Sequence, residues 1–314
     1  MDTFEVRYYR HVSDVQQKLL SNQPERLSAA DLNNIRKMVD EYGQAFLSIS
    51  NEEIVKLFDF LAAVKAKFPS FQLARDSQEI LKKAYKMFTP DGRPELFAEM
   101  VHQLSSLDFS WSDIARNHNK RKFYMDVQNS VEKVSPEALA QLTYAMGRSG
   151  AKSSELPSHL KRALWARLTE AMPAMAAESV GRCLQGLAMM GMWWSGLPVE
   201  LRQAACDALR DKTFAAPEAA EALWALGSMG QTLQNMPTYL LEKLVLGASF
   251  VERSQLSSAT LRSFARCLYG VARLRLRWRD ASKRLRFVLA DMIKQILLRS
   301  ADASVFPSIS LCLW

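Results

Sequence analysis

The sequence predicts an all-α fold, an α-α superhelix (solenoid) of helical-hairpin repeats that are about 39–45 residues long. Three observations predict it: a composition rich in helix-forming residues, a short pattern of small and apolar residues that recurs along the chain, and a proline at a fixed distance after that pattern. Glycine (12) and proline (11) are scarce among the 314 residues, and a hydrophobic content of 48% is enough for a packed core.

The recurring pattern is a small residue, a large apolar residue and a second small residue. We number each repeat from its first small residue, position 0, so that equivalent places can be compared. Position 0 is occupied by Ala145, Gly186, Ala225 and Gly270, at spacings of 41, 39 and 45 residues. Position 5 is glycine in three repeats and arginine in the fourth, namely Gly150, Gly191, Gly230 and Arg275.

A proline stands at position 12 in three of the repeats, within a Leu/Met-Pro-x-x-Leu sequence: Pro157, Pro198 and Pro237. Glycine favours the left-handed conformation that ends a helix, and proline favours the first turn of the next one. We therefore expect each repeat to be a hairpin of an A helix, which packs through its small residues, and a B helix that begins at the proline. Such hairpins cannot bury their apolar faces alone, so they stack.

The pattern extends more weakly toward the N-terminus, where Phe60 and Gln103 occupy position 0 at spacings of 43 and 42 residues. We therefore expect the repeat array to cover residues 50–299. Residues 300–314 are expected to be an incomplete terminal repeat, because the segment that ends at Trp314 matches the start of an A helix.

Residues 1–49 are expected to form an N-terminal helical cap or a divergent repeat. Two helices are predicted there, over residues 12–20 and 28–46. Ser28 is the predicted N-cap of the second helix, with Asp31 in its first turn.

Two segments carry a resemblance to a known family. The segment 216–230, with its Leu-Trp-Ala-Leu-Gly sequence, and the segment 135–147 resemble the octotricopeptide repeat, whose relatives are the heptatricopeptide and FASTK-like repeats. The likeness covers residues 135–275 well and 50–134 weakly. It implies an organellar RNA-binding protein, and it is the basis for expecting a mitochondrial location. Irregular periods and the lack of a visible RAP-type domain favour an architectural part over a sequence-specific RNA reader.

Positive charge is concentrated in one part of the chain. The formal net charge is +8, and residues 262–299 hold eleven Lys/Arg against two acidic residues, so the rest is nearly neutral. Arginine with interspersed aromatic residues suits phosphate binding, so this window is expected to bind RNA. The residues expected to contact RNA are Arg262, Arg266, Arg273, Arg275, Arg277, Arg279, Lys283, Arg284 and Arg286, with Arg182, Lys120, Arg121 and Lys122 from earlier repeats. The alternative is that this surface binds an acidic protein.

A second candidate surface is a stripe of polar residues at positions −4 and −8 of the A helices. It contains Lys56, Glu99, Gln141, Arg182, Glu221 and Arg266 at position −4, and Glu52, Glu95, Glu137, Glu178, Pro217 and Arg262 at position −8. The stripe is mostly acidic in its first half, which would repel an RNA backbone. We therefore expect most of it to face solvent or protein.

Catalytic and metal-binding patterns are missing from the sequence. The four histidines lie in different hairpins without ligand spacing, and no nucleotide-binding or hydrolase motif occurs, so we expect no enzymatic activity, cofactor, metal or small-molecule substrate. Cys183 and Cys267 share position −3 and are expected to be buried. Trp193, Trp194 and Trp314 are candidate anchors for a protein partner. No apolar run is long enough to cross a membrane, which predicts no membrane partner.

Together these features predict a non-catalytic, RNA-associated scaffold of a large assembly, such as a structural component of a mitochondrial ribosome that binds rRNA and neighbouring proteins. Two alternatives stay open: a protein-interaction solenoid that contacts no RNA, and a free organellar RNA-processing or stability factor. The second alternative requires a regular polar code along the repeats, which the sequence does not contain.

Overall fold

The computed structural model describes residues 15–20, 27–45, 50–88, 93–116, 120–232, 236–249 and 258–299. All regular structure in these residues is helical, which confirms the all-α helical-repeat solenoid. The chain divides into two compact units, Met1–Val127 and Gln128–Trp314, and each is described by itself. In the described part of the chain, no helix has the length and apolar character that a membrane span requires.

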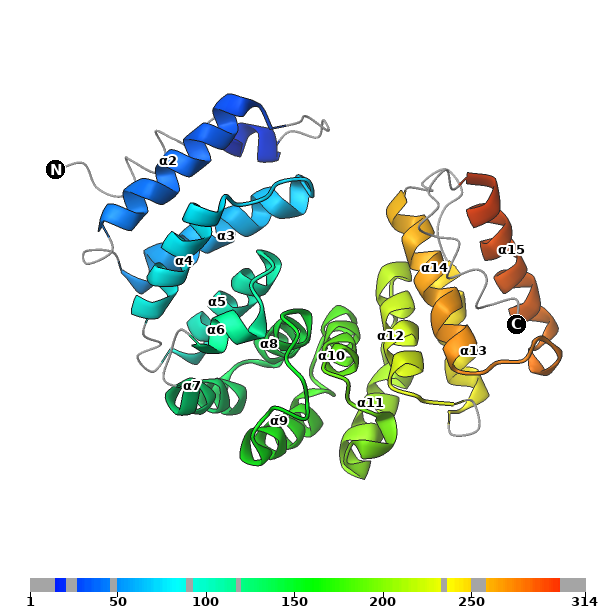
Figure 1. The fold of residues 1–314 in the computed structure, drawn as a ribbon. Helices are drawn as coiled ribbons and strands as arrows, with labels where there is room; N and C mark the ends of the chain where they lie inside the picture. The colour runs from blue at the N-terminus through cyan, green and yellow to red at the C-terminus, as the bar shows by residue number, and fades with distance from the viewer. Residues whose placement is uncertain are drawn as a thin grey trace. The chain divides into compact units, whose positions relative to one another are not determined.

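From residue 136 onward, the described residues of the second unit form four successive helical hairpins (Figure 1). Its A helices lie side by side in one layer, and contacts between B helices form a second layer. The A helices are α8 (Pro136–Arg148), α10 (Ala177–Met189), α12 (Ala216–Ser228) and α14 (Ser258–Arg273). The B helices are α9 (Ser158–Ala171), α11 (Val199–Asp211), α13 (Thr238–Ser249) and α15 (Lys283–Arg299).

Neighbouring A helices touch through their small residues, as the pattern predicts. A Cβ atom added at Gly270 of α14 would lie 2.5 Å from the carbonyl carbon and oxygen of Leu223 in α12, and one added at Gly227 would lie 2.7 Å from the Gly270 carbonyl oxygen. Gly147 and Gly186 face each other in the same way across α8 and α10. Since real Cβ atoms do not approach backbone so closely, only glycine at these places permits this helix separation.

The turn between the A and B helices has one backbone conformation in every repeat of the second unit. Position 5 is left-handed in all of them, with φ of 85° at Gly150, 72° at Gly191 and 75° at Gly230, and 59° at Arg275. Asp108, at position 5 of the weaker repeat that starts at Gln103, also has a positive φ of 63°. The backbone therefore supports the alignment of the repeat at Gln103, whereas position 5 of the repeat at Phe60 is Lys65, which lies inside the helix Asn51–Lys67 and does not form this turn.

The B helices begin where the prolines predict. Pro157 and Pro198 are the N-cap residues of α9 and α11, and Pro237 directly precedes α13. In the last hairpin Ser282 holds this place, and its Oγ accepts a hydrogen bond of 3.2 Å from the Leu285 amide. The leucine three residues later is buried in all four hairpins, at Leu160, Leu201, Leu240 and Leu285.

A repeated main-chain hydrogen bond joins the turns after α8 and α10 to the next hairpin. The amide of Ser153 donates to the Met190 carbonyl at 2.9 Å, and the amide of Trp194 donates to the Met229 carbonyl at 2.8 Å. Both bonds run from position 8 of one repeat to position 4 of the next. They fix the register of the stack independently of side-chain packing.

The first unit contains α2 (Ala29–Ala45), α3 (Asn51–Lys67), α4 (Arg75–Met87), α5 (Pro94–Ser106), α6 (Trp111–Arg116) and the first turns of α7 (Lys120–Lys133). Contacts of α3 with α5 and of α2 with α4 give two layers here too. Because α2 contacts α4 in the B layer, it occupies the place of a B helix. An aromatic cluster forms part of this core: the ring centroid of Phe123 lies 5.3 Å from that of Trp111 and 6.2 Å from that of Phe97.

The N-terminus of α2 carries the predicted cap. Ser28 Oγ accepts from the Asp31 amide at 3.2 Å, while Asp31 Oδ2 accepts from the Ser28 amide at 2.6 Å and from Lys18 Nζ at 2.6 Å. Burial raises the pKa of Asp31, but the hydrogen bonds from Lys18 and Ser28 outweigh it, so the pKa lies below its ordinary value. This carboxylate thus ties residues 15–20 to α2.

We expect Asp31→Ala to destabilise the N-terminal helices by about 1–2 kcal/mol at pH 7, because it removes a cap and the hydrogen bond that the Asp31 carboxylate accepts from Lys18. Since the folded pKa is lowered, the contribution is complete at neutral pH and is lost as the pH falls below the ordinary Asp value of 3.8. Urea unfolding followed by circular dichroism at pH 7 and pH 3 checks this. An equal gap between wild type and variant at both pH values would contradict it.

Candidate nucleic-acid interface

The structure divides the predicted basic window into two surfaces. Arg262, Arg266 and Arg273 are exposed on one face of α14, at positions −8, −4 and 3. A second group is exposed in the connection between α14 and α15 and in the first turn of α15. This group, named the basic turn, consists of Arg275, Arg277, Arg279, Lys283 and Arg284.

The stripe on the A helices largely neutralises its own charge. Arg266 Nη1 lies 3.1 Å from Glu221 Oε1, and Arg182 pairs with Glu178 one turn earlier in α10. Burial raises the pKa of Glu221, although Arg266 and Arg182 oppose this. Arg182 and Arg266, two cations of the stripe that were expected to contact RNA, are thus paired with carboxylates, and this pairing weakens their attraction for a phosphate.

The basic turn is different because, among the described residues, four of its five cations form no ion pair. Among the residues that the structure describes, one ion pair involves it, a 3.8 Å contact between Arg279 Nε and Asp280 Oδ1. The short 3-10 helix Trp278–Asp280 holds Arg279 and an exposed indole together at the outer edge of the turn. Five exposed cations on about ten residues are therefore the densest run of exposed cations along the described sequence.

Arg275 stands where the other turns of this unit have glycine. An L-residue in the left-handed region costs about 1–2 kcal/mol. Asp108 shares this backbone conformation, but its side chain pairs with Lys65, whereas Arg275 projects an exposed guanidinium. A strained arginine with an exposed side chain points to a role for the cation.

We expect Arg275→Gly to leave the unfolding free energy unchanged or to raise it by up to about 1 kcal/mol, because glycine relieves the left-handed strain. Arg275→Val should lower it by about 1–2 kcal/mol, because a β-branched residue fits this region worst. Urea unfolding curves of the two variants check whether the glycine variant is the more stable one. A valine variant as stable as the glycine variant would show that the turn adopts another conformation.

The remaining predicted cations are less favourably placed. Arg286 is half-buried on α15, and its Nε atom is buried without a hydrogen-bond partner. Arg121 and Lys122 are exposed in the first turn of α7, in the other unit, and the side chain of Lys120 lies outside the described residues. Arg286 belongs to the same unit as the basic turn, whereas Lys120, Arg121 and Lys122 belong to the other unit.

The two adjacent tryptophans separate in the structure. Trp194 is 6% exposed, so its side chain belongs to the core and is removed from the candidate partner anchors. Trp193 is 64% exposed, with one edge of its ring against Gly230 of the next repeat. Trp278 is 52% exposed within the basic turn, and it is one of the aromatic residues interspersed among the arginines of the basic window. Trp314 lies outside the described residues.

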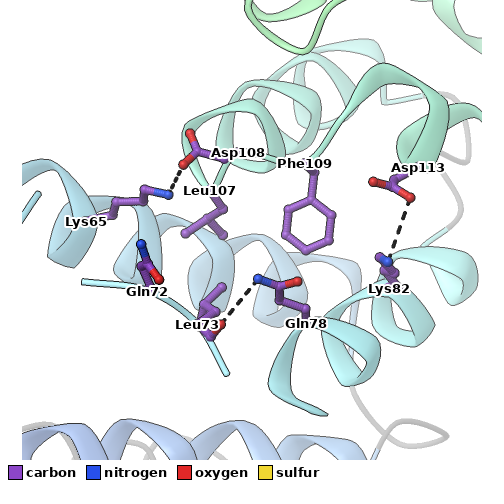
Figure 2. A pocket seen from close by; sticks show the side chains of 9 residues that line it. All are labelled: Lys65, Gln72, Leu73, Gln78, Lys82, Leu107, Asp108, Phe109 and Asp113. Carbon is purple, nitrogen blue, oxygen red and sulfur yellow. Dashed lines mark hydrogen bonds and ion pairs between the residues drawn. The ribbon is translucent and has the colours of Figure 1, made fainter. Parts of the chain in front are cut away.

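A pocket of about 210 Å³ lies in the first unit (Figure 2). Lys65 faces Asp108 on one wall and Lys82 faces Asp113 at 3.7 Å on another, with Leu107 and Phe109 between them (Figure 2). A hydrogen bond to Glu79 and the charge of Asp113 raise the pKa of Lys82. Both lysines are neutralised within the pocket, so it presents no excess charge to an anionic ligand.

No cluster of three or more His, Cys, Asp or Glu with metal-binding geometry occurs in the described ranges. Cys183 and Cys267 are buried, as predicted, and burial raises the pKa of the Cys183 thiol to about 12. That cysteine is a packing residue, because a thiol with so high a pKa is protonated and inert at neutral pH.

Comparison with known proteins gives no relative: no protein-family profile and no curated protein matches this sequence.

Proposed function

We propose that this chain is a non-catalytic helical-repeat scaffold that binds RNA in an organellar ribonucleoprotein, as a structural component of a mitochondrial ribosome or a similar particle. The basic turn of α14 and α15 binds rRNA phosphates, and the rest of the surface contacts neighbouring proteins. The observation that carries this proposal is the set of five exposed cations, four of which form no ion pair among the described residues.

Phosphate binding is favoured over base reading by the chemistry of the turn. Arginine donates several hydrogen bonds from a planar group and suits phosphate oxygens without regard to sequence. Base reading needs one polar side chain per repeat in a constant place. Position −4 instead alternates in charge, from Gln141 through Arg182 and Glu221 to Arg266. The resemblance to octotricopeptide repeats supplies the organellar setting of the proposal.

The alternative is a scaffold that binds an acidic protein at the basic turn. It predicts that protein, and not RNA, becomes crosslinked to the turn. Ultraviolet crosslinking of native particles tests it, followed by chymotrypsin digestion, since trypsin would cut so arginine-rich a segment into fragments too short to map. Nucleotide adducts on peptides from residues 270–287 are expected, and peptides from α11 serve as the internal control. Protein crosslinks without nucleotide adducts in that segment would refute RNA binding by the turn.

A further inference from the structure

The A-to-B turns of the second unit adjoin one another along one edge of the hairpin stack. Main-chain hydrogen bonds join the turn after α8 to the turn after α10, and that turn to the end of α12. The end of α12 meets the end of α14, since a Cβ atom added at Gly227 would lie 2.8 Å from the Cβ atom of Arg273. We name this continuous surface the turn edge, and its described residues are 150–159, 191–200, 230–232, 236–239 and 275–284.

Two aromatic side chains are exposed on the inner turns of this edge. Trp193, at position 7, is 64% exposed, and Tyr239, at position 14, is 53% exposed. Their hairpins, α10–α11 and α12–α13, each have a described hairpin on both sides, and neither neighbour covers these rings. Val199, six residues after Trp193, is exposed as well, so the inner turns carry an apolar patch rather than one isolated side chain.

The Trp193 ring is held in place by the next repeat. Its Cε3 and Cζ3 atoms lie where a side chain at Gly230 would begin, 2.8 Å from an added Cβ atom, so only glycine permits this placement. Within the described residues, neither the Trp193 nor the Tyr239 side chain forms a hydrogen bond. An exposed ring that is fixed before its ligand arrives loses little conformational entropy on binding, which favours stacking against a planar group.

Charge changes along the turn edge toward the basic turn. Positions 7 and 14, which hold Trp193 and Tyr239 in the inner turns, hold Arg277 and Arg284 in the basic turn. The turn before it, which precedes Tyr239, has no charged residue in its described part, and the two turns after α8 and α10 each carry an exposed glutamate. A polyanion would therefore bind through its charges at the basic turn and through uncharged groups along the inner turns.

We propose that Trp193 and Tyr239 stack against unpaired bases of an RNA strand whose phosphates bind the basic turn, so that the ligand is single-stranded RNA. The bases of a duplex are already paired and stacked, whereas those of a single strand can turn toward aromatic side chains. Stacking tolerates any base, so it needs no regular polar code along the repeats. Trp278 is not part of the proposal, because its equivalent, Trp194, is a core residue.

This inference rests on the proposed function, and it assigns the inner turns to RNA rather than to neighbouring proteins. The test measures the affinity of the full chain by fluorescence anisotropy for three labelled RNAs of equal length: a single strand, a duplex, and a single strand made of abasic residues. Wild type should bind the intact strand about tenfold or more tightly than the abasic strand, because only the intact strand can stack.

The variant Trp193→Ala/Tyr239→Ala should bind the intact single strand about 10- to 100-fold more weakly than wild type does. Its affinities for the abasic strand and the duplex should stay at the wild-type values. Its salt dependence should also be unchanged, because no phosphate contact is removed. The variant Trp193→Phe/Tyr239→Phe keeps both rings and should retain the preference for the intact strand. Leu32→Ala removes an exposed apolar side chain of the first unit and should leave all three affinities unchanged.

Wild-type affinity of the alanine variant for the intact strand, or an equal loss on the abasic strand, would overturn the stacking role and leave phosphate binding by the basic turn intact. Lack of salt-dependent RNA binding by wild type would refute the proposed function and this inference with it. In native particles, a photoreactive phenylalanine analogue at position 193 should form nucleotide adducts. Protein adducts alone would show that Trp193 contacts a protein instead, and would overturn the inference.

Discussion

Replacing Gly186 by alanine is expected to lower the unfolding free energy of the second unit by about 2–3 kcal/mol, although alanine is the better helix former. The added Cβ would meet the Thr143 carbonyl and lie 2.7 Å from the Tyr144 Cα atom. Both are backbone atoms of α8, so no side chain can rotate away. Helices α8 and α10 must separate, and the buried contacts along both are loosened.

Urea unfolding followed by tryptophan fluorescence measures this change, with Gly196→Ala as the control. Nothing lies within 4 Å of a Cβ at Gly196, so that variant should stay within about 0.5 kcal/mol of wild type. The double variant Gly147→Ala/Gly186→Ala should be less unstable than the sum of the two single variants, because the same separation relieves both clashes. Wild-type stability of Gly186→Ala would mean that the A helices are not held in backbone contact.

Reversing three charges of the basic turn, Arg275→Glu/Arg277→Glu/Arg279→Glu, is expected to weaken binding to single-stranded RNA by about 10- to 100-fold at low salt. Each lost phosphate contact also reduces the steepness of the salt dependence by about 0.7 in log–log slope, so the slope should fall by about 2. Fluorescence anisotropy with labelled RNA at several salt concentrations measures both quantities.

A matched variant separates the effect of the basic turn on RNA affinity from the effect of the net charge. Lys37→Glu/Lys83→Glu/Lys86→Glu changes three exposed lysines of the first unit and, like the triple arginine variant, lowers the formal net charge from +8 to +2. We expect it to retain most of the affinity and the wild-type salt slope. Equal loss in both variants would indicate diffuse attraction by the whole protein, and full affinity of the arginine variant would refute the role of the turn.

Periodicity predicted the fold because the residues that set it are local. Proline at position 12 and glycine at position 5 each act on their own backbone, so Pro157 and Gly150 identify a B-helix start and an A-helix end without knowledge of neighbours. The close approach at Gly186 was also predictable, since small residues are recognisable by type.

What the sequence did not reveal depends on neighbours in space. Trp193 and Trp194 are adjacent and chemically identical, yet the Trp194 ring is buried in the core, whereas the Trp193 ring is exposed and meets the next hairpin only along one edge, at Gly230. Likewise, Arg266 and Arg275 are equivalent in a charge count. Arg266 pairs with Glu221, which lies 45 residues earlier in the chain. No carboxylate among the described residues pairs with Arg275. Repeat position, rather than residue type, carries this information.

The glycine contacts make the layer of A helices in the second unit stiff, whereas the layer of B helices is more compliant. Backbone meets backbone between Gly227 and Gly270, so the distance between A helices can hardly change. Neighbouring B helices meet less extensively and through side chains, which can change rotamer. Strain applied by an assembly would therefore change the distances between neighbouring B helices, while the distances between neighbouring A helices stay nearly constant.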